Sequence, residues 1–129
     1  MNSVAVIIED RNGRVLLLLR GPTAPLMPLR WNLPGGRIEP GETSMHAAAR
    51  ETREEANLRV RTLVPVARAQ SARGGALDVY YAERWTGRVR LVDREHESYA
   101  WVPRATACEW DLIPPQRETL RWWRASFER

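Results

Sequence analysis

The sequence predicts an α/β fold in which a mixed β-sheet lies between helices. Short runs of β-branched and aliphatic residues, each bounded by a turn signal, outnumber the segments with helical periodicity. The two helical segments lie far apart in the chain, and a sheet between them would cover the apolar face of each. A length of 129 residues indicates one domain, residues 1–129, with one hydrophobic core.

The expected strands are separated by turn residues. Asn12-Gly13 is a strong hairpin signal between the first two strands. Residues 21–29 contain three prolines and are expected to form a loop, and Pro103 ends the last strand. In chain order, strands are expected at residues 3–9, 15–20, 31–33, 59–67, 77–85 and 97–102.

Two helices are expected. Thr43 or Ser44 is a suitable N-cap for a helix that runs to about Ala56. Pro114 opens the last helix, because proline is tolerated in the first helical turn. An apolar stripe on this last helix consists of Leu120, Trp123 and Phe127.

The composition excludes several classes of protein. With 43% hydrophobic and 28% charged residues, the chain is not disordered, and no apolar run is long enough to span a membrane. All 20 basic residues are arginine, which excludes a lysine Schiff base, and the pI near 10.2 favours an anionic partner. The single Cys108 is expected to be a buried hydrophobe, with a nucleophilic role as the alternative. One cysteine and an N-terminus without a signal-peptide pattern favour a cytoplasmic location.

Three carboxylates share one face of the first helix. At 100° per residue, Glu51, Glu54 and Glu55 fall within an arc of about 100°, where like charges repel. Carboxylate oxygens without histidine or cysteine favour Mg²⁺ or Mn²⁺ over zinc, so a hard-cation site is the functional interpretation. The alternative is a solvated face relieved by Arg50 and Arg53.

The rest of this helix is expected to pack on the core. Ala47 falls beside the carboxylates and would leave room there. A separate apolar stripe is expected from Met45, Ala48, Ala49, Thr52 and Ala56.

The spacing of the acidic residues resembles the Nudix box. Five residues separate Gly36 from Glu42, seven more precede Arg50 and Glu51, and a glutamate pair follows at residues 54–55. A chance match would arise in roughly one of ten thousand sequences of this composition. The chain is therefore identified as resembling the Nudix hydrolases, which implies the family's α/β/α sandwich and an enzyme that hydrolyses phosphoanhydrides.

Two positions depart from the family pattern. Thr52 stands where an aliphatic residue is usual, and its methyl group can still pack. Asn57 stands where glycine usually ends the helix, and asparagine tolerates the left-handed conformation. We expect a small loss of stability and intact chemistry.

Weaker similarities extend over nearly the whole chain. Residues 82–87, the spacing of Glu95 and Trp101, and residues 111–116 resemble the MutT-type branch, which hydrolyses nucleoside triphosphates to monophosphates and pyrophosphate. The resemblance implies Mg²⁺ as cofactor, with Mn²⁺ as a substitute, and a small-molecule nucleotide as substrate. We expect no membrane association, no stable nucleic-acid partner, and a monomer or homodimer.

The resemblance also implies roles for individual residues. Arg50 would orient Glu54, and Glu42 would support the loop or its metals, or cap the helix. The general base is left open between Glu54, Glu95 and His96, although we expect His96 to be exposed to solvent; His46 faces away and has no assigned role. The metal ligands would be a backbone carbonyl of Gly35 or Gly36 and the carboxylates of Glu51, Glu54, Glu55 and Glu95.

Substrate contacts are expected from other segments. Arg20 ends the second strand, where the family often places a phosphate contact, and Trp31 and Tyr81 could line a base pocket. Gln116 or Arg117 lies near the position where the MutT-type branch reads a purine edge with asparagine.

Two other functions stay open. Residues 95–102 also resemble Nudix members that hydrolyse nucleoside diphosphate sugars, such as GDP-mannose, in which a histidine can act as base; this alternative includes hydrolysis of another nucleoside diphosphate derivative. The other alternative is a non-catalytic Nudix module that binds nucleotide or RNA through its arginines.

Overall fold

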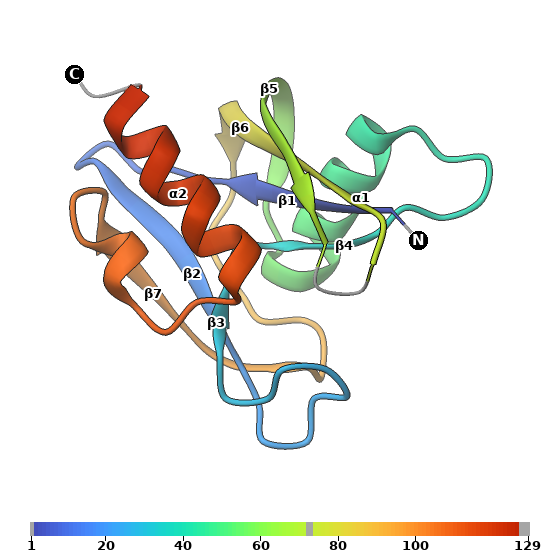
Figure 1. Cartoon of the computed structure of the whole chain (residues 1–129), viewed down its shortest axis with the longest axis horizontal. Helices are drawn as coiled ribbons and strands as arrows, with labels where there is room; N and C mark the ends of the chain where they lie inside the picture. The colour runs from blue at the N-terminus through green and yellow to red at the C-terminus, as the bar shows by residue number, and fades with distance from the viewer. Residues whose placement is uncertain (1, 72–73, 127–129) are drawn as a thin grey trace.

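A computed structural model describes residues 2–71 and 74–126 of the chain (Figure 1). The helices and strands of this part of the chain are β1 Ser3–Ile7, β2 Arg14–Arg20, β3 Trp31–Asn32, β4 Gly35–Arg37, α1 Ser44–Ala56, β5 Arg59–Gln70, β6 Ala76–Thr86, β7 His96–Pro103, the 3₁₀ turn η1 Ala107–Glu109, and α2 Pro114–Ser126.

The strands form two sheets. The first has the order β4-β1-β6-β5, in which β1 and β6 are parallel and the other pairs antiparallel. The second is antiparallel, with the order β3-β2-β7. The turn between β1 and β2 joins them, since the Leu16 N–H donates to the Ile8 carbonyl. Helices α1 and α2 lie on opposite sides of the strands (Figure 1), which confirms the expected mixed α/β architecture, with two sheets in place of one.

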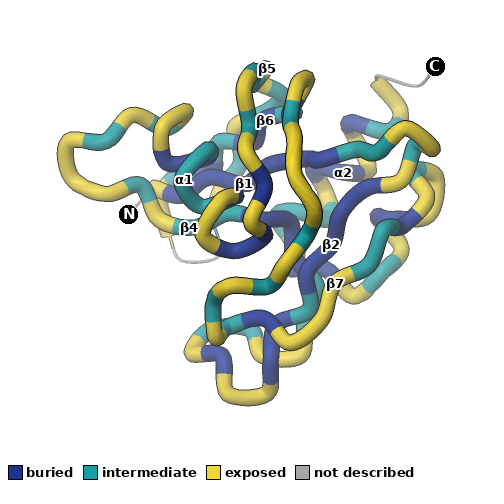
Figure 2. Tube along the Cα trace, turned by 180° about the vertical axis from the view of Figure 1, so that it is seen from behind, coloured by how far each residue is buried: buried dark blue, intermediate teal, exposed yellow. Residues whose placement is uncertain are grey.

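Alternation along β1 and β2 explains why two helices are needed. Successive side chains of a strand point to opposite faces. Val4 and Leu16 therefore pack with Ala47 and Ala48 of α1, while the next residue on each strand belongs to the core beneath α2. The strands are buried on both faces, as Figure 2 shows for the centre of the molecule. The α2-side core includes Ala5, Ile7, Val15, Leu17, Leu120 and Trp123.

Both ends of α1 are capped as its sequence predicts. The Thr43 hydroxyl accepts a hydrogen bond from the His46 N–H at 3.1 Å. Asn57 adopts the left-handed conformation with φ of 63°, and its N–H donates to the Arg53 carbonyl. Asn57 therefore ends α1 in the conformation that a glycine usually adopts there. Thr52, the other departure from the family pattern, is fully buried.

The buried face of α1 differs from the expected stripe. Met45 is exposed, whereas Ala47 is fully buried against the strands. A small side chain at position 47 lets the helix lie close to the sheet, where methionine would not fit. The buried face of α1 is therefore rotated relative to the expected stripe, and this rotation also turns the Glu55 side chain inward.

The segment after β6 has no regular secondary structure and crosses the end of α1. The Arg90 N–H donates to the Ala56 carbonyl at 3.0 Å, and the Val92 N–H donates to the Glu55 carbonyl at 3.4 Å. These bonds bring Asp93 to the C-terminal end of α1. Cys108 is buried in η1, as expected of a small core residue. Phe127 lies outside the described residues, and no described helix is long and apolar enough to cross a membrane.

Candidate active site

The glycines of β4 allow α1 to lie directly against the strand. Glu55 Oε1 accepts a hydrogen bond from the Gly35 N–H at 2.9 Å. A β-carbon at Gly36 would lie 2.5 Å from Cδ of Glu51 and 2.7 Å from each of its carboxylate oxygens. A β-carbon at Gly35 would lie 2.1 Å from the Val4 carbonyl oxygen, which is backbone and cannot move aside. The glycine pair therefore permits this close approach of two carboxylates to the chain.

Arg50 holds the outer side of the carboxylate cluster. Its Nε and Nη2 donate to Glu42 at 2.7 and 2.9 Å, and its Nη1 donates to Glu51 at 2.9 Å and to Glu54 at 3.2 Å. The bidentate bond from Arg50 lowers the pKa of Glu42 to about 2. Nη2 also donates to the Arg37 carbonyl at 3.0 Å, which ties the helix to β4.

A cavity of about 920 Å³ opens above Gly35 and Gly36. Burial raises the pKa of the Glu55 carboxyl well above its ordinary range, and the negative charges of Asp93 and Glu95 add to this effect. Burial also raises the pKa of Glu51, while Arg50 opposes that rise. The charged groups around the cavity include Arg20, Arg37, Glu39, Glu51, Glu55 and Glu95.

Glu54 occupies a different position from the other two carboxylates of its helix. Its side chain is about half exposed, and Arg50 holds it at the surface of α1. It is not among the described residues that line the cavity, whereas Glu95 is.

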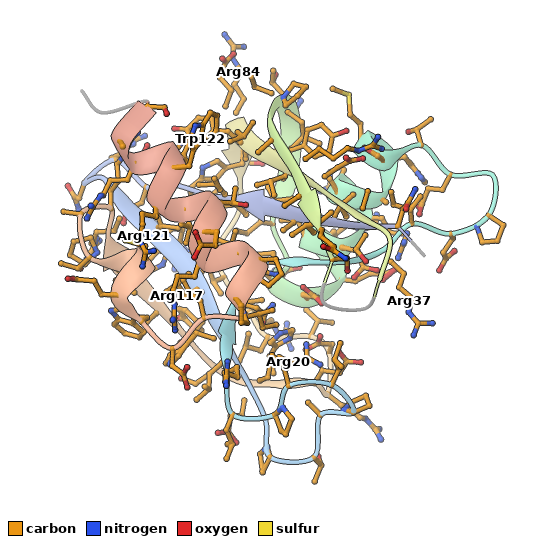
Figure 3. All side chains as sticks on the ribbon, viewed as in Figure 1. Arg20, Arg37, Arg84, Arg117, Arg121 and Trp122 are labelled. Carbon is orange, nitrogen blue, oxygen red and sulfur yellow. The ribbon has the colours of Figure 1, made fainter. Side chains whose placement is uncertain are left out.

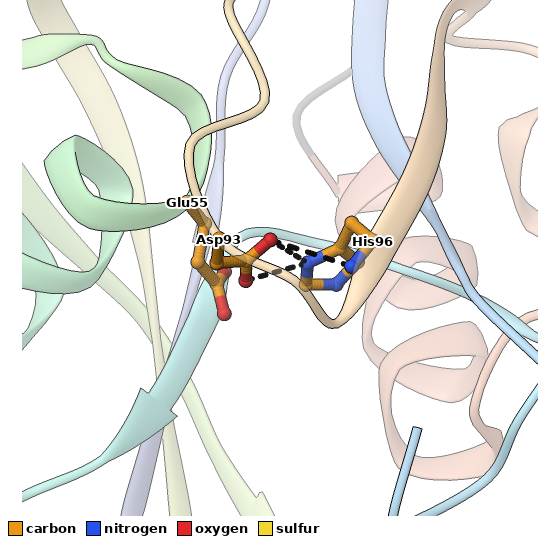
Figure 4. Close-up of side chains that lie close together, drawn as sticks. All are labelled: Glu55, Asp93 and His96. Atoms are coloured by element: carbon orange, nitrogen blue, oxygen red, sulfur yellow. Dashed lines mark hydrogen bonds and ion pairs between the residues drawn. The ribbon is translucent and has the colours of Figure 1, made fainter. Parts of the chain in front are cut away.

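Asp93, in the turn before β7, and His96, the first residue of β7, join the site. His96 Nδ1 lies 2.9 Å from Asp93 Oδ2, and Figure 4 shows Asp93 beside both Glu55 and His96. One possible ligand atom from each of these three residues lies within 4.8 Å of the others. His96 is 5% exposed, so the expectation of a solvent-exposed histidine is wrong, and burial lowers its pKa. The sequence argument missed Asp93, because no spacing rule links it to the helix.

A second, narrow cavity of about 60 Å³ adjoins the first, and Arg20 and the two glycines line both. Gln116, which lies half-buried in the first turn of α2, reaches this cavity, and its Oε1 accepts from the Leu33 N–H at 2.7 Å. Arg20 is 4% exposed, and its Nε donates to the Leu26 carbonyl at 2.6 Å. Its Nη2 lies 3.6 Å from Glu95 Oε2. Figure 3 shows Arg20 where β2 runs into the loop that follows it.

Three of the expected substrate contacts lie elsewhere. Trp31 packs edge-to-face on Trp110 with ring centroids 4.7 Å apart. The Tyr81 hydroxyl donates to Glu9 at 2.9 Å, and its ring packs on Trp123 beneath α2. Arg117 Nη2 donates to the Trp110 carbonyl at 3.4 Å. None of these three residues is among the described residues that line the two cavities. Their side chains are engaged instead in core packing and backbone contacts.

The residues around Glu55 fit a hard divalent cation. A buried carboxylate needs a counter-charge, and none of the ion pairs among the described residues involves Glu55. The surrounding donors are mostly carboxylate oxygens, the ligands that such ions prefer. The glycine pair, moreover, leaves space for an ion next to the backbone.

Comparison with known proteins decides the family. The family model described as the NUDIX domain matches residues 1–123. The chain belongs to the Nudix hydrolase family. It is therefore an enzyme that acts on phosphoanhydride bonds, and Nudix enzymes typically use a divalent metal ion.

Similar proteins include pyrophosphohydrolases of the MutT type. The Nudix chain is 31% identical over 121 residues to a putative 8-oxo-dGTP diphosphatase 2 of Mycobacterium tuberculosis, covering 91% of this chain and 84% of that protein. It is also 31% identical over 114 residues to the CTP pyrophosphohydrolase of Escherichia coli, covering 86% and 82%. The crystal structure of a MutT protein from Methanosarcina mazei superposes with a TM-score of 0.83 at 24% identity, covering 100% of this chain and 96% of that one. The fold is thus the Nudix fold of MutT structures.

Proposed function

We propose that this Nudix pyrophosphohydrolase converts nucleoside triphosphates to nucleoside monophosphates and pyrophosphate in the presence of Mg²⁺, with Mn²⁺ as a substitute. The observation that carries this proposal is that two adjoining cavities share Arg20 in their walls. The wide one is lined by carboxylates and suits a metal-bound polyphosphate, and the narrow one, with both apolar and polar side chains in its walls, suits the edge of a base. The two relatives described above are named for hydrolysis of nucleoside triphosphates, which is consistent with this choice.

The metal would be held by Glu51 and Glu55 together with a backbone carbonyl of Gly35 or Gly36, with Glu54 as a further ligand, whereas Glu95 is assigned to proton transfer. When bound, a divalent cation neutralises phosphate oxygens and lowers the pKa of a coordinated water. The protein itself keeps the carboxylates against Gly35 and Gly36. Arg50 does this from the outer side of the helix through its hydrogen bonds to Glu51 and Glu54.

Glu95 is our proposed general base. It lines the wide cavity, whereas Glu54 is held at the helix surface by Arg50. His96 is a poor candidate, because both of its ring nitrogens are engaged, by Asp93 and by Asn32. The nucleoside diphosphate sugar alternative drew in part on a histidine base, and the engagement of both His96 ring nitrogens makes it the less favoured choice.

The substrate contacts follow from the same cavities. Arg20 would contact a phosphate between the two cavities, and Gln116 would contact the base. A single nucleotide panel with Mg²⁺ in H₂¹⁸O tests the proposal. We expect triphosphates to yield monophosphate and pyrophosphate, with one product carrying the label. Faster cleavage of GDP-mannose than of every triphosphate would refute it.

Two variants test the assignment of the base. We expect Glu95→Gln to lower kcat by orders of magnitude with the melting temperature retained, and Glu54→Gln to lower kcat through loss of a metal ligand, so that excess Mg²⁺ restores part of its activity. If Glu95→Gln keeps nearly full activity, Glu95 is not the base.

A further inference from the structure

The side chains of Glu55, Asp93 and His96 converge at one largely buried point (Figure 4). One possible ligand atom from each lies within 4.8 Å of the other two, and Glu55 and His96 are 6% and 5% exposed. Asp93 and His96 come from the segment that crosses the end of α1, and neither is among the described residues that line the wide cavity. The three residues are therefore a second set of possible ligands, which shares only Glu55 with that cavity.

The hydrogen bonds of Asn32 determine which nitrogen of His96 carries a proton. Asn32 Nδ2 donates to the Leu33 carbonyl at 2.6 Å, so it is Oδ1 of this amide that faces His96 Nε2 at 3.0 Å. An amide oxygen only accepts hydrogen bonds, and Nε2 is therefore the donor and keeps its proton. In the neutral ring the other nitrogen, Nδ1, then carries a lone pair, and neutral imidazole is the form that binds a metal.

This nitrogen and two carboxylates are three acceptors that face one another. His96 Nδ1 lies 2.9 Å from Asp93 Oδ2, while Asp93 Oδ1 accepts from the backbone N–H of His96 at 3.3 Å. Glu55 accepts from the Gly35 N–H through Oε1, and no ion pair among the described residues involves its carboxylate. A single proton can join only two of the three groups, whereas a divalent cation can bind all three and also neutralises both carboxylates.

The kinds of donor atom indicate which cation fits. Zinc takes imidazole nitrogen and carboxylate oxygen together and often leaves its fourth position to water, whereas Mg²⁺ is bound through oxygen. A histidine that binds a metal through one nitrogen usually donates from the other to an oxygen atom, as His96 does to Asn32. Asp93 and His96 already lie close together, and a short movement of the Glu55 side chain brings in the third ligand.

We propose that Glu55, Asp93 and Nδ1 of His96 form a binding site for Zn²⁺, and that zinc bound there inhibits the enzyme. The inhibition rests on the proposed function, in which Glu55 is a ligand of the Mg²⁺ ion, whereas the binding of zinc does not. Zinc at this site takes the Glu55 carboxylate from that ion. Because a site with a nitrogen ligand favours zinc over Mg²⁺, excess Mg²⁺ does not displace it.

Binding is measured on the whole chain, without nucleotide and in excess Mg²⁺. We expect isothermal titration calorimetry to show one tight Zn²⁺ site per chain. We also expect ¹⁵N NMR of the imidazole rings to show zinc on Nδ1 of His96, with Nε2 still protonated. The sequence has only two histidines, so the exposed His46 is an internal reference whose signals should not change. No zinc binding in Mg²⁺, or binding that changes His46 and leaves His96 as it was, overturns the proposal.

The variant Asp93→Asn removes a ligand and blocks another. Its Oδ1 can still accept from the backbone N–H of His96, while its Nδ2 takes the place of Oδ2 and donates to Nδ1, which occupies the lone pair that zinc needs. We expect its zinc affinity to fall by about a hundredfold or more.

The matched control is Asp111→Asn, which removes the same charge from exposed ion pairs with Arg30 and Arg117. It should bind zinc as the wild type does. Equal zinc affinities in the two variants would refute the site. The NMR measurement on the wild type decides the site even if Asp93→Asn does not fold.

Hydrolysis of CTP in excess Mg²⁺ tests the inhibition. We expect one equivalent of Zn²⁺ per chain to lower kcat by about tenfold or more. Half-inhibition of Asp93→Asn, relative to its own rate without zinc, should need at least about tenfold more Zn²⁺. Zinc that binds to His96 without slowing hydrolysis would refute the inhibition. If no triphosphate is hydrolysed at all, the proposed function fails, and calorimetry and NMR still decide whether the zinc site exists.

Discussion

His96 Nε2 lies 3.0 Å from Asn32 Oδ1, and both side chains are buried. The two residues are 64 positions apart and join the start of β7 to strand β3. On its other side the His96 ring meets Asp93, beside Glu55 (Figure 4). From Asn32 the chain of contacts continues through Leu33 to Gln116. The metal-ligand side and the base side of the proposed site thus share one hydrogen-bonded frame.

The first prediction concerns His96. Replacing it with phenylalanine leaves Asp93 and Asn32 without their shared partner, and each unpaired buried group costs about 1–3 kcal/mol. We expect the melting temperature of His96→Phe to fall by at least about 5 °C, and kcat to fall because Glu95, the preceding residue in the chain, is no longer anchored through the buried His96 ring. Differential scanning calorimetry and steady-state kinetics measure the two effects. The control is His46→Phe, since His46 is exposed and, among the described residues, its side chain pairs with Glu42 at the helix surface. A His96→Phe protein as stable as its control would show that the frame has no energetic role.

The second prediction distinguishes the two glycines of β4. In Gly36→Ala the new β-carbon meets the flexible Glu51 side chain, so the protein folds but Glu51 moves. We expect kcat to fall by about a hundredfold and the stabilisation of the protein by Mg²⁺ to shrink. In Gly35→Ala the β-carbon meets backbone, and we expect poor folding.

Gly21→Ala is the control for this pair, because its β-carbon would lie at an ordinary 3.7 Å from the Glu95 carbonyl oxygen. It should keep the wild-type melting temperature. Equal losses of stability in Gly35→Ala and Gly36→Ala would contradict the distinction.

The third prediction concerns pH and Glu55. Because burial raises the pKa of Glu55 in the folded state, the folded protein holds a proton that the unfolded chain has already released. The stability of the metal-free protein therefore falls as pH rises from the ordinary glutamate pKa towards the raised one. Glu55→Gln keeps an acceptor for the Gly35 N–H and removes this penalty.

In EDTA we expect Glu55→Gln to melt above the wild type at neutral pH, with the difference narrowing toward pH 4. Adding Mg²⁺ reverses the order, because only the wild type has the full ligand set. Thermal melts across this pH range with and without Mg²⁺ measure both effects. A metal-free variant that melts below the wild type at neutral pH would argue against a buried, uncompensated charge.

The fourth prediction concerns Arg50. Lysine at this position keeps the charge but cannot bond at once to Glu42, Glu51 and the Arg37 carbonyl. We expect Arg50→Lys to lower kcat by about ten- to a hundredfold, with a smaller change in KM. Arg53→Lys, an exposed position on the same helix, is the matched control and should behave as wild type. Equal kinetics for the two variants would show that Arg50 serves only as a surface charge.

Local sequence determined those features that depend on near neighbours. Strand alternation and helical periodicity predicted the fold class, because each element needs a covered apolar face. The resemblance to the Nudix box predicted that Glu51, Glu54 and Glu55 would lie beside Gly35 and Gly36. Glu51 and Glu55 do so, because one helix and one strand supply them and the glycines, whereas Glu54 lies at the surface of the helix. The left-handed end of α1 at Asn57 was predicted for the same reason.

Only the tertiary structure decided which distant residues meet. Asp93, His96 and Asn32 come together because backbone bonds from residues 90 and 92 bring that segment to the end of α1. Core packing under α2 took Tyr81 away from the cavities, and the rotation of α1 buried Ala47 and exposed Met45. Such contacts depend on the three-dimensional packing of segments far apart in the chain, and the periodicity of a single segment carries no information about them.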